Sequence, residues 1–147
     1  QMCIRDSSRL CIVNKSTAKM SIFWRGYPDA RDIPAGNSNC NSGYESDRAD
    51  VAGSLEYEPA DTPGTRHLLS VAAHNAYVNS PKADAIFVLP NGDKMGACNW
   101  YVPGKTKSFD TGWLHGNMTR LDDSEDNKEF VLTLTDKVSE PSGESCY

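Results

Sequence analysis

Apolar and polar side chains alternate in several short segments of this chain, separated by stretches rich in Gly, Pro, Asn and Asp. In residues 54–58, Leu55 and Tyr57 fall on one face and two glutamates on the other, which is the two-residue period of a half-buried strand. Residues 130–135 show the same strict alternation. The pattern predicts β-strands at both places.

Two apolar runs near the beginning of the chain predict a hairpin. Residues 10–13 and residues 20–24 flank a turn-prone Asn-Lys-Ser-Thr sequence at 14–17. The next segment, 25–43, favours a loop with at most one short strand, because Gly and Pro recur in it among Asn and Asp.

A second hairpin is predicted around an Asn-Gly pair. Residues 85–89 and 94–101 flank the sequence Pro-Asn-Gly-Asp at 90–93. Asn-Gly between such runs is a strong hairpin signal, because both residues accept the positive φ of a tight turn.

Residues 67–78 are ambiguous from periodicity alone. Five of their apolar residues fit one face of a helix, whereas Leu69, Val71 and Ala73 fit one face of a strand. Counted over the whole chain, about seven or eight short strands separated by turns predict an all-β fold, a single antiparallel β-sandwich. We expect the sandwich to span residues 8–138 and residues 139–147 to form a C-terminal tail.

The first seven residues read like the translation of a sequencing-library adapter, so we leave them out of the fold prediction. The alternative is a genuine N-terminal segment. On the adapter interpretation, the native N-terminus and any signal peptide before it are undetermined.

The length and net charge of the chain argue against several classes of function. A chain of 147 residues fits one domain, and its formal net charge of −5 has the wrong sign for gripping nucleic acid through bulk charge. A transmembrane helix needs about 20 consecutive apolar residues, and every apolar run in this chain is shorter. We therefore expect neither a nucleic-acid partner nor a transmembrane segment.

The cysteines favour a secreted protein. They lack the close CxxC spacing of zinc and redox sites, so two long-range disulfides are expected, with three pairings open. Free thiols in a cytosolic protein are the alternative. The candidates, once Cys3 of the adapter-like segment is set aside, are Cys11, Cys40, Cys98 and Cys146.

Motifs that carry catalysis are absent from the sequence. It has no HExxH, GxSxG or GxxxxGK[ST], and His67 and His74 would face opposite sides of a strand. We therefore expect no enzyme activity, no metal and no cofactor. Glu56 and Glu58 have the residue type of a glycosidase pair, but carboxylates at this spacing more often form a solvated strand face.

Aromatic residues give the strongest hint of binding. Trp100 and Tyr101 lie beside Lys105 and Lys107 in a predicted loop, and Trp113 follows shortly after. Trp and Tyr rings favour membrane interfaces and also stack on sugars. The alternative is that the tryptophans fill the core of the sandwich.

Four short motifs occur in an order that resembles the aegerolysin family and the related small insecticidal crystal proteins. They are Ile-Val-Asn-Lys-Ser at 12–16, Ile-Pro-Ala-Gly at 33–36, Val-Ala-Gly-Ser-Leu-Glu-Tyr at 51–57, and the stretch 74–84. Val51 and Asn79 stand where the family pattern has glycine, and Ala76 where it has proline.

The resemblance implies a β-sandwich that binds membrane lipids, with residues 67–78 as a strand. It also implies contacts to lipid head groups or partner proteins at Asn75, Tyr77 and Asn79. The sequence thus predicts a secreted lipid-binding protein, cytolytic if it acts with a partner protein. The expected ligand-binding residues are Asn75, Tyr77, Asn79, Trp100, Tyr101, Lys105, Lys107 and Trp113.

Two other binding functions remain open at this point. One is a carbohydrate-binding module, and the other is an adhesive domain of a larger extracellular protein. A flat row of aromatic rings on a sheet would favour sugar, whereas rings at loop tips would favour a membrane.

Overall fold

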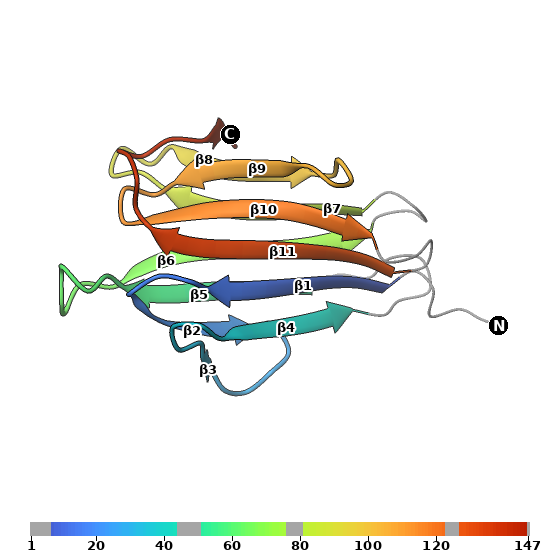
Figure 1. Ribbon diagram of the computed structural model, residues 1–147, viewed down its shortest axis with the longest axis horizontal. Coiled ribbons are helices and arrows are strands. Elements are labelled where there is room, and N and C mark those ends of the chain that lie inside the picture. The colour runs from blue at the N-terminus through green and yellow to red at the C-terminus, as the bar shows by residue number, and fades with distance from the viewer. Residues whose placement is uncertain (1–6, 44–50, 76–80, 123–126, 147) are drawn as a thin grey trace.

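A computed structural model describes residues 7–43, 51–75, 81–122 and 127–146. In these residues all regular secondary structure is β, and the strands form two sheets that face each other (Figure 1). The predicted all-β sandwich is confirmed, with twelve strands in place of seven or eight. The additional strands are mostly short or polar, so they carry little hydrophobic alternation.

Five strands make one sheet and seven make the other. The first sheet has the order β4 (Ser38–Gly43), β1 (Ser7–Asn14), β11 (Asn127–Asp136), β10 (Leu114–Asp122) and β9 (Thr106–Asp110). The second has the order β12 (Glu144–Ser145), β8 (Lys94–Trp100), β7 (Pro81–Val88), β6 (His67–Asn75), β5 (Val51–Glu58), β2 (Lys19–Trp24) and β3 (Arg31–Asp32). The β1–β11 pair is parallel, and the other strand pairs are antiparallel.

The core lies between the sheets and follows the predicted alternation. Leu55 and Tyr57 of β5 are buried, whereas both glutamates of that strand are only partly covered. Residues 67–75 form β6, with Leu69 and Val71 buried, so the strand interpretation holds for this part of the ambiguous segment. Periodicity alone does not decide between helix and strand, and the pairing of this segment with β5 and β7 on its two sides makes it a strand.

The predicted first hairpin is wrong. β1 and β2 follow each other in sequence but belong to opposite sheets, so the segment between them is a corner. The buried Asn14 side chain holds this corner: its Nδ2 donates to the carbonyls of Ala18 (3.2 Å) and Ile33 (2.8 Å). Hydrophobic alternation identifies each strand but does not say which sheet it joins, since both strands bury one face in the same core.

The Asn-Gly hairpin is confirmed as the connection between β7 and β8. Gly92 has a φ of +96° and donates its backbone N–H to Leu89 at 2.8 Å, whereas Asn91 keeps a negative φ. Residues 25–43 contain the two-residue β3 and also the six-residue β4. β4 has almost no apolar residues, which is why its sequence looks like a loop.

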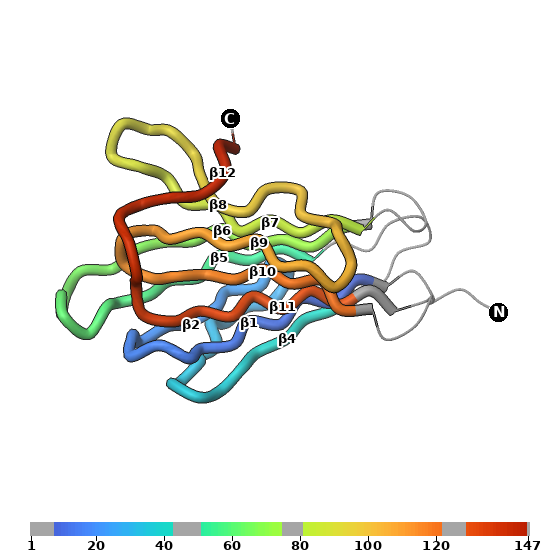
Figure 2. Tube along the Cα trace, turned by 45° about the horizontal axis from the view of Figure 1, so that its top comes forward, coloured from blue at the N-terminus to red at the C-terminus, as the bar shows by residue number. Residues whose placement is uncertain are grey.

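The segment expected as a C-terminal tail is tied to the sandwich. It crosses one end of the molecule (Figure 2), where Ser142 pairs with Asp110 through backbone hydrogen bonds of 2.9 Å. β12 then pairs with β8, and Cys146 is buried. Pro and Gly in the segment mark its turns rather than the end of ordered structure. We call residues 137–146 the C-terminal strap.

The described ranges contain no helix long and apolar enough to cross a membrane.

Candidate functional site

The expected binding residues fall at two opposite ends of the sandwich. β9 runs from Thr106 to Asp110, with the β8–β9 connection before it and the β9–β10 connection after it (Figure 1). Five strand residues span about 17 Å. The structure therefore separates Trp113 from Trp100, Tyr101 and Lys105 instead of gathering them into one site.

Trp100 and Lys107 pack against each other between the sheets. The indole lies against the hydrophobic core from β8, and Lys107 reaches toward it from β9 with its Nζ 6.0 Å from the ring centre. The indole Nε1–H donates to the carbonyl of Lys105 at 3.1 Å. Because its N–H is used and its face is approached by a lysine, Trp100 closes the end of the core rather than offering a free platform.

The connection between β8 and β9 is held in one shape by hydrogen bonds to its backbone. Arg120 of β10 donates through its guanidinium to the carbonyl of Tyr101, and its own carbonyl accepts the N–H of Gly104 at 2.9 Å. Lys105 also donates its N–H to Val102 at 3.3 Å. None of these bonds involves the Tyr101 side chain. Tyr101 is 56% exposed.

A second exposed residue with a large apolar side chain lies at this end of the sandwich. Leu121 follows Arg120 in β10 and is 46% exposed. Lys105 is also exposed. We call Tyr101, Lys105 and Leu121, with the loop 101–105, the loop end of the molecule.

Asn75 belongs to the same end. It is the last residue of β6 and pairs with Pro81, two positions along β7 from Ala83, which pairs with Trp100. Tyr77 and Asn79 lie outside the described residues, so their predicted roles stay predictions.

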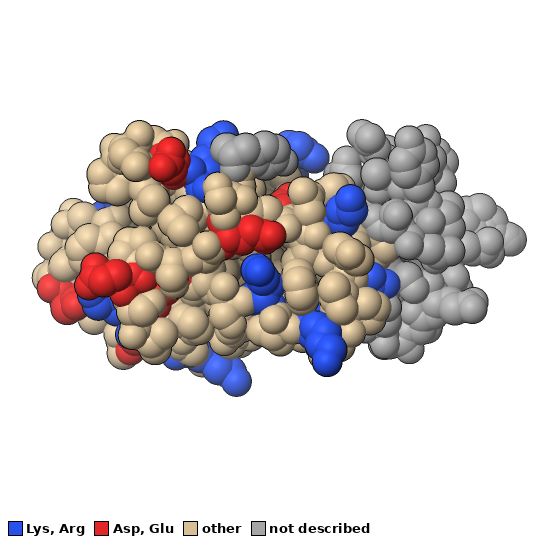
Figure 3. All heavy atoms as spheres, turned by 90° about the horizontal axis from the view of Figure 1, so that it is seen from above, with Lys and Arg blue, Asp and Glu red and all other residues tan. Residues whose placement is uncertain are grey.

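Charged side chains are unevenly distributed on the edge formed by β8 and β9. In Figure 3 the Asp and Glu atoms lie mainly in the left half of the view, whereas Lys and Arg atoms are scattered over both halves.

Trp113 lines a pocket of about 570 Å³ at the other end of the sandwich. Its ring stacks on His67 with the ring centres 4.5 Å apart, and His67 in turn packs against Tyr57 at 5.4 Å. Leu68 and Val88 border the same pocket, and each is 61% exposed. We call this cavity the end pocket.

Burial shifts the ionisation of two groups in the end pocket. It raises the pKa of the Tyr57 phenol to about 12. The hydrogen bond between the Tyr57 and Thr111 hydroxyls, 2.8 Å long, acts in the opposite direction and lowers this pKa. Burial also lowers the pKa of His67, so the imidazole stays neutral near pH 7.

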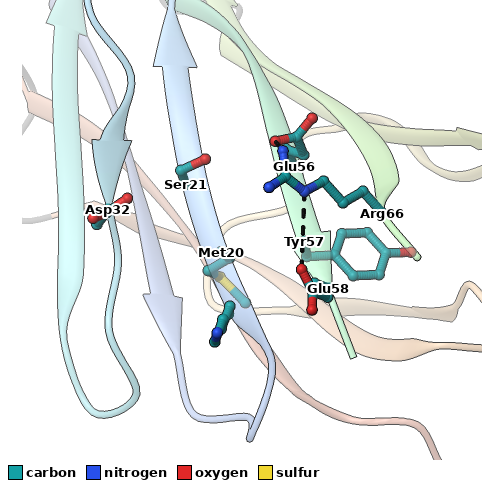
Figure 4. Close-up of a pocket in the computed structure, with 8 residues that line it drawn as sticks. Met20, Ser21, Asp32, Glu56, Tyr57, Glu58 and Arg66 are labelled. Atoms are coloured by element: carbon teal, nitrogen blue, oxygen red, sulfur yellow. Dashed lines mark hydrogen bonds and ion pairs between the residues drawn. The ribbon is translucent and has the colours of Figure 1, made fainter. Parts of the chain in front are cut away.

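A second hollow, of about 250 Å³, lies on the outer face of the seven-stranded sheet. Figure 4 shows Arg66 between the carboxylates of Glu56 and Glu58, and its guanidinium is 3.3 Å from the first and 3.9 Å from the second. One arginine thus pairs with both carboxylates on an open surface. They do not form a cleft with an acid and a base on opposite walls, as glycoside hydrolysis needs.

Metal ligands do not converge anywhere in the described part of the chain, where no group of three or more His, Cys, Asp or Glu residues could hold an ion. His67 and His74 fall on opposite faces of β6. His74 lies 3.8 Å from Asp84 on the outer face.

The described residues contain two disulfides, which link the four candidate cysteines whose pairing the sequence left open. Cys11 joins Cys40 between the neighbouring strands β1 and β4. Cys98 joins Cys146 and fastens the C-terminal strap to β8. Disulfides of this kind are compatible with an extracellular protein.

No family model, curated protein or solved structure matches this chain. The family likeness drawn from the four sequence motifs therefore stays a prediction.

Three residues of these sites were not expected from the sequence: Arg120, Leu121 and His67. Arg120 and Leu121 belong to β10, whose Gly and Asn obscure its alternation. The weak apolar alternation of Leu114, Gly116 and Met118 is the one signal that would have revealed this strand. His67 stacks on a ring 46 residues away in sequence, which no local pattern reports.

Proposed function

We propose that this protein is a secreted, non-catalytic module that binds membrane lipid head groups through the loop end. The observation that carries the proposal is the exposed Tyr101 ring on a loop held by hydrogen bonds from β10. Tyr rings favour the membrane interface because the ring is apolar and the hydroxyl polar. A preorganised loop loses little conformational entropy on docking.

Neighbouring side chains support a lipid surface as the target. Leu121 adds apolar area beside the loop, and Lys105 supplies a cation that suits a lipid phosphate. Lys107 contributes less, because its ammonium is directed toward Trp100. Since the whole chain carries a net charge of −5, zwitterionic or neutral head groups fit better than a strongly anionic bilayer.

The positions of the rings favour a membrane over a sugar. Among the described residues, the exposed rings are Phe23, Tyr27, Tyr101 and Trp113, and they lie on different strands and loops. They do not form the flat row on one sheet that would suit a polysaccharide chain. A glycan partner is therefore the second choice.

Co-sedimentation with liposomes tests the proposal. We expect wild-type protein to pellet with vesicles of zwitterionic or neutral lipids, and Tyr101→Ala to reduce the bound fraction at least threefold. Phe23→Ala is the matched control, because Phe23 is also about half exposed but lies on the outer face of β2. Equal loss in both variants, or no pelleting at all, would overturn the proposal.

Vesicles rich in phosphatidylserine and a glycan array complete the experiment. Binding to phosphatidylserine that is as strong as to neutral vesicles, and is lost in salt, would contradict head-group recognition, because screening removes only charge attraction. Binding to glycans without pelleting would assign the module to carbohydrate instead.

A further inference from the structure

The end pocket arises where two strands of the seven-stranded sheet separate. β6 pairs with β5 as far as His67, but its pairing with β7 stops at Ser70 and Ile86. Leu68 and Val88 therefore border a gap instead of forming a cross-strand pair. Behind the gap, the Trp113 ring from the β9–β10 connection and the His67 ring form the inner wall.

Three rings lead from solvent into the core at this wall. Trp113 is 38% exposed, His67 is partly buried, and Tyr57 is 2% exposed. His67 stacks on Trp113 with an interplanar angle of 20°. A ring of a ligand that enters the pocket can extend this stack through the part of Trp113 that remains exposed.

Few polar side-chain groups of the end pocket are free to bond a ligand; the buried Nε2 of His67 is one that has no hydrogen-bond partner among the described residues. The hydroxyls of Tyr57 and Thr111 bond to each other. The charged residues that border the pocket are Lys137 and Glu140 of the C-terminal strap, and their charges cancel. A sugar needs several free hydrogen-bonding groups around its hydroxyls, and this pocket does not offer them. The surroundings suit an uncharged, largely apolar molecule.

From this geometry we infer that the end pocket is a binding site for a small, neutral, ring-containing molecule that stacks on Trp113. Its volume of about 570 Å³ fits the range of pockets that bind small organic molecules, roughly 300–1,000 Å³. The site lies at the opposite end from Tyr101 and does not depend on lipid binding there.

Fluorescence titration with N-phenyl-1-naphthylamine, a neutral two-ring probe, tests the site. We expect saturable enhancement with one probe per chain. Trp113→Ala removes the stacking surface, and Val88→Trp fills the gap between β6 and β7. Each of these two substitutions should lower the affinity for the probe at least tenfold, whereas Tyr101→Ala should leave the affinity within twofold of wild type. Far-ultraviolet circular dichroism and thermal melts show that each variant is folded.

Competition identifies the ligand class. Displacement by 1-naphthol but not by 1-dodecanol supports a ring-binding site. Displacement by 1-dodecanol alone would overturn the ring assignment. Absence of saturable binding, or binding that both pocket variants leave unchanged, would overturn the site itself. A positive liposome result with a negative probe titration would refute this inference and leave the proposed lipid function standing.

Discussion

The carboxylate of Asp110 accepts the backbone N–H of Val138 at 2.8 Å, across 28 residues of sequence. Asp110 has no exposed surface, and it also accepts the N–H of Gly112 at 2.7 Å and of Ser139 at 3.2 Å. His115 lies 3.4 Å from the same carboxylate. One buried acid thus fixes both the β9–β10 connection and the C-terminal strap, and both border the end pocket.

Replacing Asp110 should loosen this end of the protein. Asp110→Ala leaves the N–H groups of Gly112, Val138 and Ser139 without their acceptor, and a lost charged hydrogen bond or an unsatisfied buried group costs about 1–3 kcal/mol. We expect the free energy of unfolding to fall by about 3 kcal/mol in urea denaturation. Asp136→Ala is the control, because Asp136 lies on the exposed surface and bonds to Thr17. A loss at Asp110 no larger than at Asp136 would contradict the role assigned here.

The disulfides should be found by peptide mapping under non-reducing conditions. We expect linked peptides that join Cys11 to Cys40 and Cys98 to Cys146. In the chain-entropy model each loop contributes about 4 kcal/mol, so Cys98→Ser with Cys146→Ser should clearly lower the unfolding free energy. A Cys11–Cys98 peptide, or free thiols after expression in an oxidising compartment, would contradict the assigned pairing.

The strands that could be predicted from the sequence are those with clear alternation. β5, β11 and the β7–β8 hairpin were predicted because each buries every second residue or contains an Asn-Gly turn. β4 and β10 were missed because a strand stabilised mainly by its neighbours does not need apolar residues at every inward position. Which sheet each strand joins depends on contacts that are distant in sequence, as the corner at Asn14 shows.

The candidate sites were less predictable than the fold. The sequence indicated Trp100, Tyr101, Lys105 and Trp113 as binding residues, but it did not place Trp113 at the opposite end from the others. Nor did it show that the Trp100 indole donates its N–H to the carbonyl of Lys105, or that the Lys107 ammonium lies over its ring. The exposure and orientation of these side chains depend on how the two sheets pack. Residue type and spacing along the sequence predict that packing only in part.

Asn14 should be essential for stability although it lies at a surface corner. Besides its two donated bonds, its Oδ1 accepts the N–H of Ser16 at 2.9 Å and the Ser16 hydroxyl at 2.6 Å. Asn14→Ala leaves these buried groups unsatisfied and should lower the unfolding free energy by about 3 kcal/mol. The exposed neighbour Lys15 provides the control, since surface substitutions usually change stability by less than about 0.5 kcal/mol. If substitutions of Asn14 and Lys15 lowered the unfolding free energy by similar amounts, the corner would not depend on the Asn14 side-chain amide.

Stability should decrease at high pH because of Tyr57. Its pKa is about 12 in the folded protein, raised mainly by burial, whereas in the unfolded chain the phenol keeps its ordinary pKa of 10.0. Between these values the unfolded chain loses the phenolic proton while the folded chain keeps it, so the unfolding free energy falls as pH rises. Two pKa units correspond to about 3 kcal/mol by pH 12, with the loss beginning near pH 10. Tyr57→Phe should flatten this part of the profile, measured by urea denaturation from pH 8 to 11.5. A wild-type profile that is flat above pH 10, or one that Tyr57→Phe leaves unchanged, would show that the phenol is not the titrating group.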